Sequence, residues 1–250
     1  FDTLMNADKF NIGLMEFLDN SPTPFHVVLN MITHLSKYGY DELDLRESCE
    51  HPFSSSFFIT SNNSSIIAFK KGKKRIEDSG IRLVGAHTDS PCIKIKPCPE
   101  IQKYGLLQLG VEIYGAALLG PWFDRDLSIA GRVNCLLKDN QRKSFILDFK
   151  RSIATIPSLA IHLDRNANNN RNINPQSEIV PILCEILSEE NANFREILKK
   201  QIIDQYIRND IKSVTDFDLC FYDNQPSHQI GLNGDFLASA RLDNLLSCYV

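Results

Sequence analysis

His87 is the residue whose neighbours in the sequence most directly suggest chemistry. It follows the apolar run at residues 81–86, and Asp89 stands two positions later. Side chains two positions apart in an extended chain point to the same side, so the carboxylate of Asp89 can reach the imidazole of His87. A carboxylate that accepts one ring N–H leaves the other ring nitrogen free to bind a metal. A structural or capping His–Asp pair has the same spacing, and the pattern alone leaves both interpretations open.

A second candidate, Asp243, stands between a predicted strand at residues 236–240 and a helix that begins near Leu242. In a two-metal site a carboxylate can bridge ions that lie about 3.5–4 Å apart. An aspartate at such a junction can equally cap the helix by accepting backbone N–H groups. The spacing does not decide between a bridging ligand and a helix cap.

Two further segments carry residue types that occur in active sites. The only tryptophan, Trp122, stands beside an acid–base–acid triplet at residues 124–126, which we interpret as a packed corner held by ion pairs or as an oligomer contact. His162 is the one histidine of the apolar run at residues 156–163. A histidine in such a run is more often structural than functional, so neither segment by itself predicts catalysis.

These candidates depend on a first region in which helices precede short strands. Helical spacing of apolar residues predicts two helices, and Pro22 and Pro24 separate them. Apolar runs around a polar turn and after a glycine predict three strands. The predicted helices cover residues 4–19 and 25–37, and the predicted strands cover residues 57–60, 65–69 and 81–86.

The chain changes character from about residue 97 to residue 235. Short strand-like segments alternate there with turns, and one long helical segment lies among them. The asparagine-rich residues 166–174 predict an exposed loop. The predicted strands are residues 106–114, 132–137, 144–149 and 218–222, and the predicted helix is residues 194–208. We interpret this region as a β-rich domain inserted into the first one.

Composition excludes several classes of partner. The net charge is −4, from 27 basic and 31 acidic residues, with no basic stripe that would bind nucleic acid. No apolar run is long enough to span a membrane. The seven cysteines are odd in number and form no CxxC pair, which indicates reduced thiols in a cytoplasmic protein rather than a disulfide framework. The first residue is Phe rather than Met, so we expect the chain to begin inside a longer coding sequence or to have been trimmed.

Five segments together resemble one peptidase family in their order along the chain. They are residues 21–26 (SPTPFH), 85–91 (GAHTDSP), 122–126 (WFDRD), 156–163 (IPSLAIHL) and 241–244 (RLDN). This order is similar to that of the M18 aspartyl aminopeptidases, and the likeness covers essentially all 250 residues. On this basis the chain is identified as a member of that family.

The resemblance implies an α/β fold, in which an incomplete zinc-aminopeptidase-like catalytic domain is interrupted by a β-rich dimerisation domain. The expected segments are residues 1–94 for the first part of the catalytic domain, 95–236 for the insert and 237–250 for the truncated second part. Members of the family assemble into homo-oligomers, which are dodecamers built from dimers.

The resemblance also implies roles for four residues. His87 matches a ligand of one zinc ion, and Asp243 matches the aspartate that bridges both zinc ions and precedes a cis peptide bond. Asp89 matches the carboxylate of the catalytic site that orients this histidine. His162 matches a histidine that the insert projects into the active site of the neighbouring subunit, where it would help to bind the substrate or to stabilise the tetrahedral intermediate.

The implied reaction is removal of an N-terminal Asp or Glu from a peptide. Two zinc ions would lower the pKa of a bridging water and polarise the scissile carbonyl, and a glutamate would act as general base. In the family a Glu-Glu pair, a further Asp and a final His lie downstream of the bridging aspartate, whereas this sequence ends seven residues after Asp243. We therefore expect this chain alone to be inactive and to hold zinc weakly or not at all.

Two other functions stay open. One is a non-catalytic protein of the same fold that keeps the oligomerisation or interaction role of the insert. The other is a binding module without zinc that uses only the insert, and this leaves the pairing of His87 with Asp243 unexplained. A Glu-Glu pair, an Asp and a His in the coding sequence past Val250 would favour the enzyme.

Overall fold

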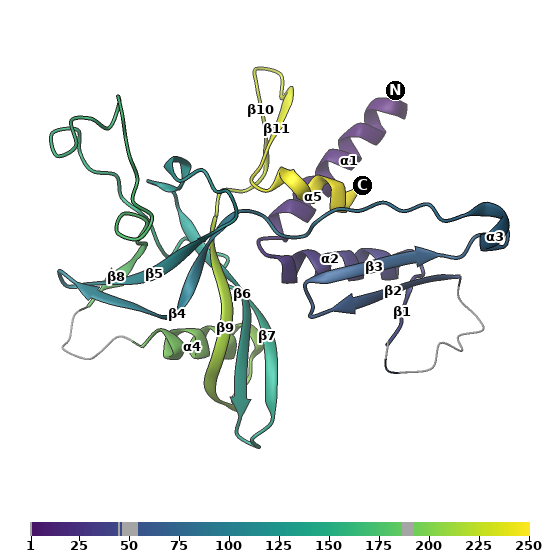
Figure 1. Ribbon diagram of the computed structural model, residues 1–250, viewed down its shortest axis with the longest axis horizontal. Coiled ribbons are helices and arrows are strands. Elements are labelled where there is room, and N and C mark those ends of the chain that lie inside the picture. Colours follow the sequence, from purple (N-terminus) through teal and green to yellow (C-terminus); the bar gives the residue numbers. More distant parts are fainter. Residues whose placement is uncertain (1, 45, 47–54, 187–192) are drawn as a thin grey trace. The chain divides into compact units, whose positions relative to one another are not determined.

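The computed structural model describes residues 2–44, 46, 55–186 and 193–250, which fall into two compact units (Figure 1). The first unit combines residues 1–90 with residues 226–250, and the second is residues 91–225. The fold is mixed α/β, and in the sequence a β-rich unit interrupts the other one, as predicted. The assignment of catalytic and dimerisation domains, with limits at residues 94/95 and 236/237, stays a prediction.

Helices dominate the first unit, and both helices predicted near its N-terminus are confirmed. Its elements are α1 (Asp2–Asp19), α2 (Pro24–Lys37), β1 (Asp41–Glu42), β2 (Ser56–Ser61), β3 (Ser65–Lys70), α3 (Ile76–Ser79), β10 (His228–Ile230), β11 (Phe236–Ala238) and α5 (Leu242–Tyr249). Strands β1, β2 and β3 form one small sheet in that order, and β10 pairs with β11. The chain turns between β2 and β3 at Asn62 and Asn63, whose positive φ angles of 52° and 56° suit asparagine better than most residues.

The core of the first unit lies where its helices meet. Buried apolar side chains from α1, α2 and α5 form one cluster, made of Leu14, Leu18, Val27 and Leu245. Helix α2 begins with Pro24 after Thr23, because proline at the first helical position already has a helical φ and needs no partner for an N–H group. No helix in the described part of the chain is both long and apolar enough to reach across a membrane.

The third strand predicted for this unit, at residues 81–86, is wrong. Among the described residues the segment has no strand partner, and its side chains face solvent: Ile81 is 77%, Leu83 is 90% and Val84 is 91% exposed. A strand is stable only when a neighbour satisfies its backbone N–H and C=O groups, and an apolar run does not supply that neighbour. The segment is therefore an exposed apolar stretch that leads to His87.

A six-stranded antiparallel sheet forms the second unit, in the order β7-β6-β9-β4-β5-β8. Its elements are β4 (Cys92–Lys103), β5 (Leu106–Tyr114), η1 (Gly120–Trp122), β6 (Leu127–Leu137), β7 (Arg142–Asp148), β8 (Ile182–Glu185), α4 (Phe194–Tyr206) and β9 (Ile211–Asp223). Helix α4 lies along the sheet and buries Phe194, Leu198 and Ile202 in the core (Figure 1). The four strands and the helix predicted for this region are confirmed.

Strand β4 is the longest element of this sheet that the sequence pattern did not predict. Its 12 residues include Pro97 and Pro99, and a proline removes a backbone donor from a sheet ladder. The pairing of β4 with β5 shifts register between Ile95 and Glu100, so both prolines lie in an irregular stretch of the ladder. This irregularity reconciles the prolines with a central place in the sheet.

We predict that leucine-to-alanine substitutions at two positions of the first unit have very different costs. Leu83→Ala should change the free energy of unfolding by less than about 0.5 kcal/mol, because its side chain is already in water. Leu18→Ala should cost about 2–5 kcal/mol, because Leu18 is fully buried. Urea unfolding followed by circular dichroism measures both, and a cost above about 1.5 kcal/mol at Leu83 would mean that residues 81–86 are packed in solution.

Candidate metal centre

Helix α5 places Asp243 by packing its C-terminal end against α1. The ring of Tyr249 lies 5.2 Å from the ring of Phe10, and Leu245 joins the buried cluster of the first unit. Gly13 leaves room for this contact, because a Cβ at that position would lie 2.2 Å from the Tyr249 hydroxyl oxygen. The first turn of α5, which carries Asp243, is thereby held on the first unit.

His87 and Asp243 lie close together in space. The Nε2 atom of His87 is 4.0 Å from Asp243 Oδ1. On the other side of the ring, His87 Nδ1 is 2.9 Å from the main-chain oxygen of Asp89 and 3.3 Å from Asp89 Oδ1. Three of the four residues that the sequence singled out are therefore brought together, and all three belong to the first unit.

The contacts of His87 Nδ1 decide which ring nitrogen is available to a metal. Both atoms near Nδ1, the main-chain oxygen and a carboxylate oxygen of Asp89, are acceptors, so Nδ1 carries the proton and donates it. Nε2 then keeps its lone pair, and Nε2 is the nitrogen nearer to Asp243. The nearer acceptor is the main-chain oxygen, whereas the resemblance gave the orienting role to the carboxylate.

The pair His87 and Asp243 supplies two donors of the kinds that zinc binds. Imidazole nitrogen and carboxylate oxygen bind zinc at about 2.0–2.2 Å, and at tetrahedral angles two such atoms lie about 3.3–3.6 Å apart. His87 Nε2 and Asp243 Oδ1 are 4.0 Å apart, so they would have to approach each other by roughly half an ångström to bind one ion in that geometry. The peptide bond between Asp243 and Asn244 is cis, in agreement with the resemblance. Catalytic zinc sites use three protein ligands, and within the described residues no group of three or more His, Cys, Asp or Glu could hold a metal. The residues present fit two positions of a zinc site and leave the others open.

Side chains of α5 hold the main chain at His87 on both sides. The His87 N–H donates to Asn244 Oδ1 at 3.3 Å, and the His87 carbonyl oxygen accepts from the Cys248 thiol at 3.3 Å. The next residue is tied as well, because the Thr88 hydroxyl donates to the main-chain oxygen of Ser64 at 2.7 Å. Burial raises the pKa of the Cys248 thiol, which keeps it protonated as a donor. These contacts cannot be predicted from the sequence, because no spacing pattern links α5 to His87.

His162, the fourth candidate, is exposed and belongs to the second unit, in a turn at residues 160–164. The base of its loop is fixed by Asp124, which has a positive φ of 59°. The Asp124 N–H donates to the main-chain oxygen of Ile156 at 2.9 Å, and Asp124 Oδ1 accepts from the main-chain N–H of Ser158 at 2.8 Å. Asp124 thus determines where the loop that carries His162 begins.

The corner predicted around Trp122 is confirmed as a packed corner with an ion pair. Trp122 and Phe123 pack against the core of the second unit. Arg125 Nη1 lies 3.1 Å from Asp223 Oδ2. The guanidinium of Arg171 lies 3.9 Å from the centre of the Phe123 ring, at cation–π distance. The corner therefore ties the asparagine-rich loop to the sheet through Arg171.

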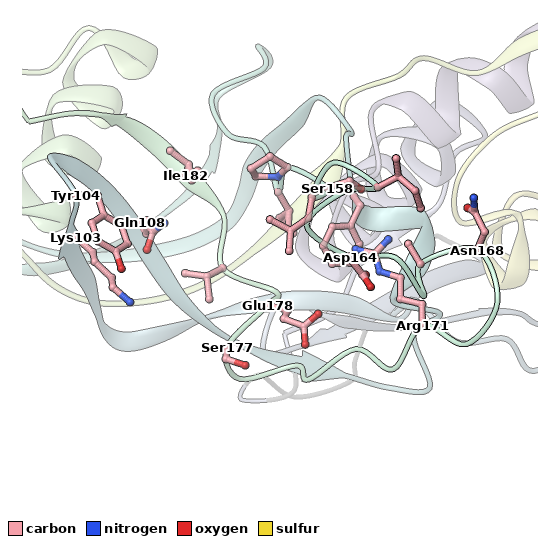
Figure 2. A pocket seen from close by; sticks show the side chains of 17 residues that line it. Lys103, Tyr104, Gln108, Ser158, Asp164, Asn168, Arg171, Ser177, Glu178 and Ile182 are labelled. Carbon is pink, nitrogen blue, oxygen red and sulfur yellow. The ribbon is translucent and has the colours of Figure 1, made fainter.

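A cavity of about 590 Å³ is lined in part by the loop that carries His162 (Figure 2). Polar side chains gather at its two ends, with Lys103, Tyr104 and Gln108 at one end and Asp164, Asn168 and Arg171 at the other. Glu178 lies between the two groups. Because both signs of charge line the cavity, its electrostatics favour no single class of ligand.

The hydrogen bond from the Ser158 N–H to the Asp124 carboxylate should depend on pH. The N–H of Ser158 holds the pKa of Asp124 below its ordinary value of 3.8. Because the folded pKa is lowered, the interaction is fully present above the ordinary pKa and is lost as the pH falls through the folded value. In NMR spectra the amide proton shift of Ser158 should therefore titrate with a midpoint below 3.8.

Asp124→Asn is the matched control for this titration. Asparagine keeps an acceptor oxygen and tolerates a positive φ, but it does not ionise. The Ser158 shift should then stay flat over the same pH range. A midpoint at or above 3.8 in the original chain, or the same titration in the variant, would contradict the assignment.

Known proteins are similar in sequence to this chain over nearly its whole length. The family model described as Aminopeptidase I zinc metalloprotease (M18) matches residues 17–250. A probable M18 family aminopeptidase 2 of Pseudomonas entomophila is 53% identical over 242 residues, which are 97% of this chain and 56% of that protein. The chain thus spans about half the length of the curated relatives that it matches.

Solved structures share the fold as well. This chain superimposes on a chain in the cryo-EM structure of the Ape4 and Nbr1 complex with a TM-score of 0.88 at 34% identity, over 96% of this chain and 49% of that one. For mApe1 of Chaetomium thermophilum the TM-score is 0.82 at 30% identity, over 95% of this chain and 56% of that one. The match of residues 17–250 to the family model, together with this fold, means that the chain belongs to the M18 family of aminopeptidases.

Proposed function

We propose that this chain forms part of a zinc-dependent aminopeptidase that removes Asp or Glu from the N-terminus of peptides. The observation that carries the proposal is the 4.0 Å approach of His87 Nε2 to Asp243 Oδ1. Membership of the M18 family supports the aminopeptidase reaction. The preference for an acidic first residue rests on the resemblance of five sequence segments to aspartyl aminopeptidases.

In this proposal the residues of the chain have distinct roles. His87 would hold one zinc ion through Nε2, and Asp243 would supply a carboxylate shared by two zinc ions. Bound zinc would supply a water of lowered pKa and would polarise the scissile carbonyl. Asp89 keeps the proton on His87 Nδ1, so that Nε2 stays a donor to metal. His162, which is exposed on the second unit, binds the substrate of a neighbouring subunit.

The proposal includes assembly into a homo-oligomer. The S. cerevisiae mApe1, which has the same fold at 23% identity, is described as a dodecamer. We propose a dodecamer built from dimers for the protein to which this chain belongs, with the second unit as the dimerisation domain. We place this protein in the cytoplasm, because its seven cysteines are odd in number and form no CxxC pair.

A second candidate function is that of a non-catalytic protein with the same fold. The coding sequence past Val250 separates the two candidates. A Glu-Glu pair, an Asp and a His there would support the enzyme, and their absence would support the non-catalytic protein.

We predict that the 250-residue chain alone does not hydrolyse peptides. The family's general base and its remaining zinc ligands lie downstream of Asp243, and the chain ends before them. With zinc present, release of free Asp from a peptide with an N-terminal Asp should equal the blank when followed by chromatography. Hydrolysis by the purified chain, with host peptidases removed, would contradict this expectation.

Zinc binding by the chain should be weak and should depend on His87. His87→Ala removes the only imidazole beside Asp243 among the described residues, so residual zinc retention in equilibrium dialysis should fall to background. His162→Ala is the matched control, because His162 belongs to the second unit and is proposed to touch substrate rather than metal. Equal retention of zinc by His87→Ala and by the original chain would contradict the proposed role of His87 as a zinc ligand.

A further inference from the structure

His87 is held in place although the chain before it is not. Residues 81–86 have no strand partner among the described residues, and their apolar side chains lie in solvent. An extended segment without ladder hydrogen bonds keeps much of its conformational freedom and does not fix the residue that follows. The position of His87 must therefore come from contacts made by His87 itself and by the residues after it.

Two of these contacts come from α5, the helix that also carries Asp243. Asn244 Oδ1 accepts the His87 N–H at 3.3 Å, and the Cys248 Sγ lies 3.3 Å from the His87 carbonyl oxygen. Asn244 and Cys248 stand four positions apart, so they lie on one face of the helix, one turn apart. Together they bind both backbone polar groups of a single residue.

One helix therefore determines the positions of both residues of the candidate metal site. Asp243 is carried by α5, and His87 is bound to α5 through its main chain. The contact of the His87 main chain with α5 therefore determines the 4.0 Å separation between Nε2 and Asp243 Oδ1. This separation does not require residues 81–86 to pair with another strand. The imidazole itself has a separate restraint, because Nδ1 donates to Asp89.

We propose that Asn244 and Cys248 are positioning residues, which hold the main chain of His87 so that its imidazole faces Asp243. We name this pair the His87 clamp. Neither member binds metal in this proposal, and both act through His87. The consequence for metal binding rests on the proposed function, whereas the clamp itself does not.

Amide hydrogen exchange at His87 tests the contact between the His87 N–H and Asn244. Asn244→Ala removes the acceptor, so exchange of the His87 N–H measured by NMR should become faster by between about two- and tenfold. Asn244→Asp keeps a side-chain oxygen in the same place, so its exchange should stay near that of the original chain. Exchange at Phe58, which is buried in β2, reports whether each variant has kept its fold.

The chemical shift of the His87 carbonyl carbon tests the contact between Cys248 and the His87 carbonyl oxygen. Cys248→Ala removes the donor and should move this shift, whereas Cys248→Ser supplies a hydroxyl donor and should restore it. Ser247→Ala is the matched control, because Ser247 is exposed on the same helix next to Cys248. It should change neither the carbonyl shift nor the amide exchange at His87.

The order parameter of the His87 ring reports positioning directly. It should fall in Asn244→Ala and in Cys248→Ala, and it should stay at its original value in Asn244→Asp, Cys248→Ser and Ser247→Ala. The clamp would be overturned if the order parameter of the His87 ring stayed unchanged in both alanine variants. An equal decrease of this order parameter in Ser247→Ala would also overturn it. Where an alanine variant loses its fold, the same spectra of Asn244→Asp and Cys248→Ser decide, because loss of ring order in these variants also overturns it.

Zinc separates failure of the clamp from failure of the proposed function. Zinc added to the original chain should shift the His87 ring signals, and the alanine variants should need about tenfold more zinc for the same shift. If zinc leaves the original ring signals unchanged while the exchange and ring-order results hold, the clamp stands and the metal role of His87 is withdrawn. If all variants respond to zinc alike, Asn244 and Cys248 do not position a ligand.

Discussion

The packing of α5 against α1 is the constraint on which the candidate site depends. Residues 91–225 separate the two parts of the first unit, so His87 and Asp243 meet only because the returning chain docks on the N-terminal helices. Apolar contacts make most of that docking, and Arg241 adds a hydrogen bond to the main-chain oxygen of Leu18 at 3.2 Å. If α5 moved, the site would lose a carboxylate and the two side chains that hold its histidine.

Hydrogen bonds rather than burial specify the geometry of this site. His87 and Asp243 are both largely exposed, yet the main-chain N–H, the main-chain carbonyl oxygen and the Nδ1 atom of His87 each have a hydrogen-bond partner in the first unit. In a working metal site the surrounding shell controls solvent access and tunes the ligands. The first unit thus orients His87 and leaves the side chains of both His87 and Asp243 open to solvent.

Local patterns predicted α1, α2, α4 and the turn between β2 and β3, because periodic apolar residues and turn residues act over a few positions. The strand expected at residues 81–86 failed, since a strand exists only beside a neighbour that local sequence does not reveal. The candidate site was found for a different reason. Motif resemblance identified His87 and Asp243, whereas the contacts of Asn244 and Cys248 arise from tertiary packing that no spacing records.

His87 and Asp243 are proposed to be ligands of one metal ion, and zinc bound to both side chains would be the direct proof. Crystals of the longer protein of which this chain is proposed to form part, soaked in zinc and measured on both sides of the zinc absorption edge, locate bound zinc by its anomalous scattering. We expect a peak at about 2.0–2.2 Å from both His87 Nε2 and a carboxylate oxygen of Asp243. A map with no peak there, or with zinc bound only to other side chains, would contradict this proposal.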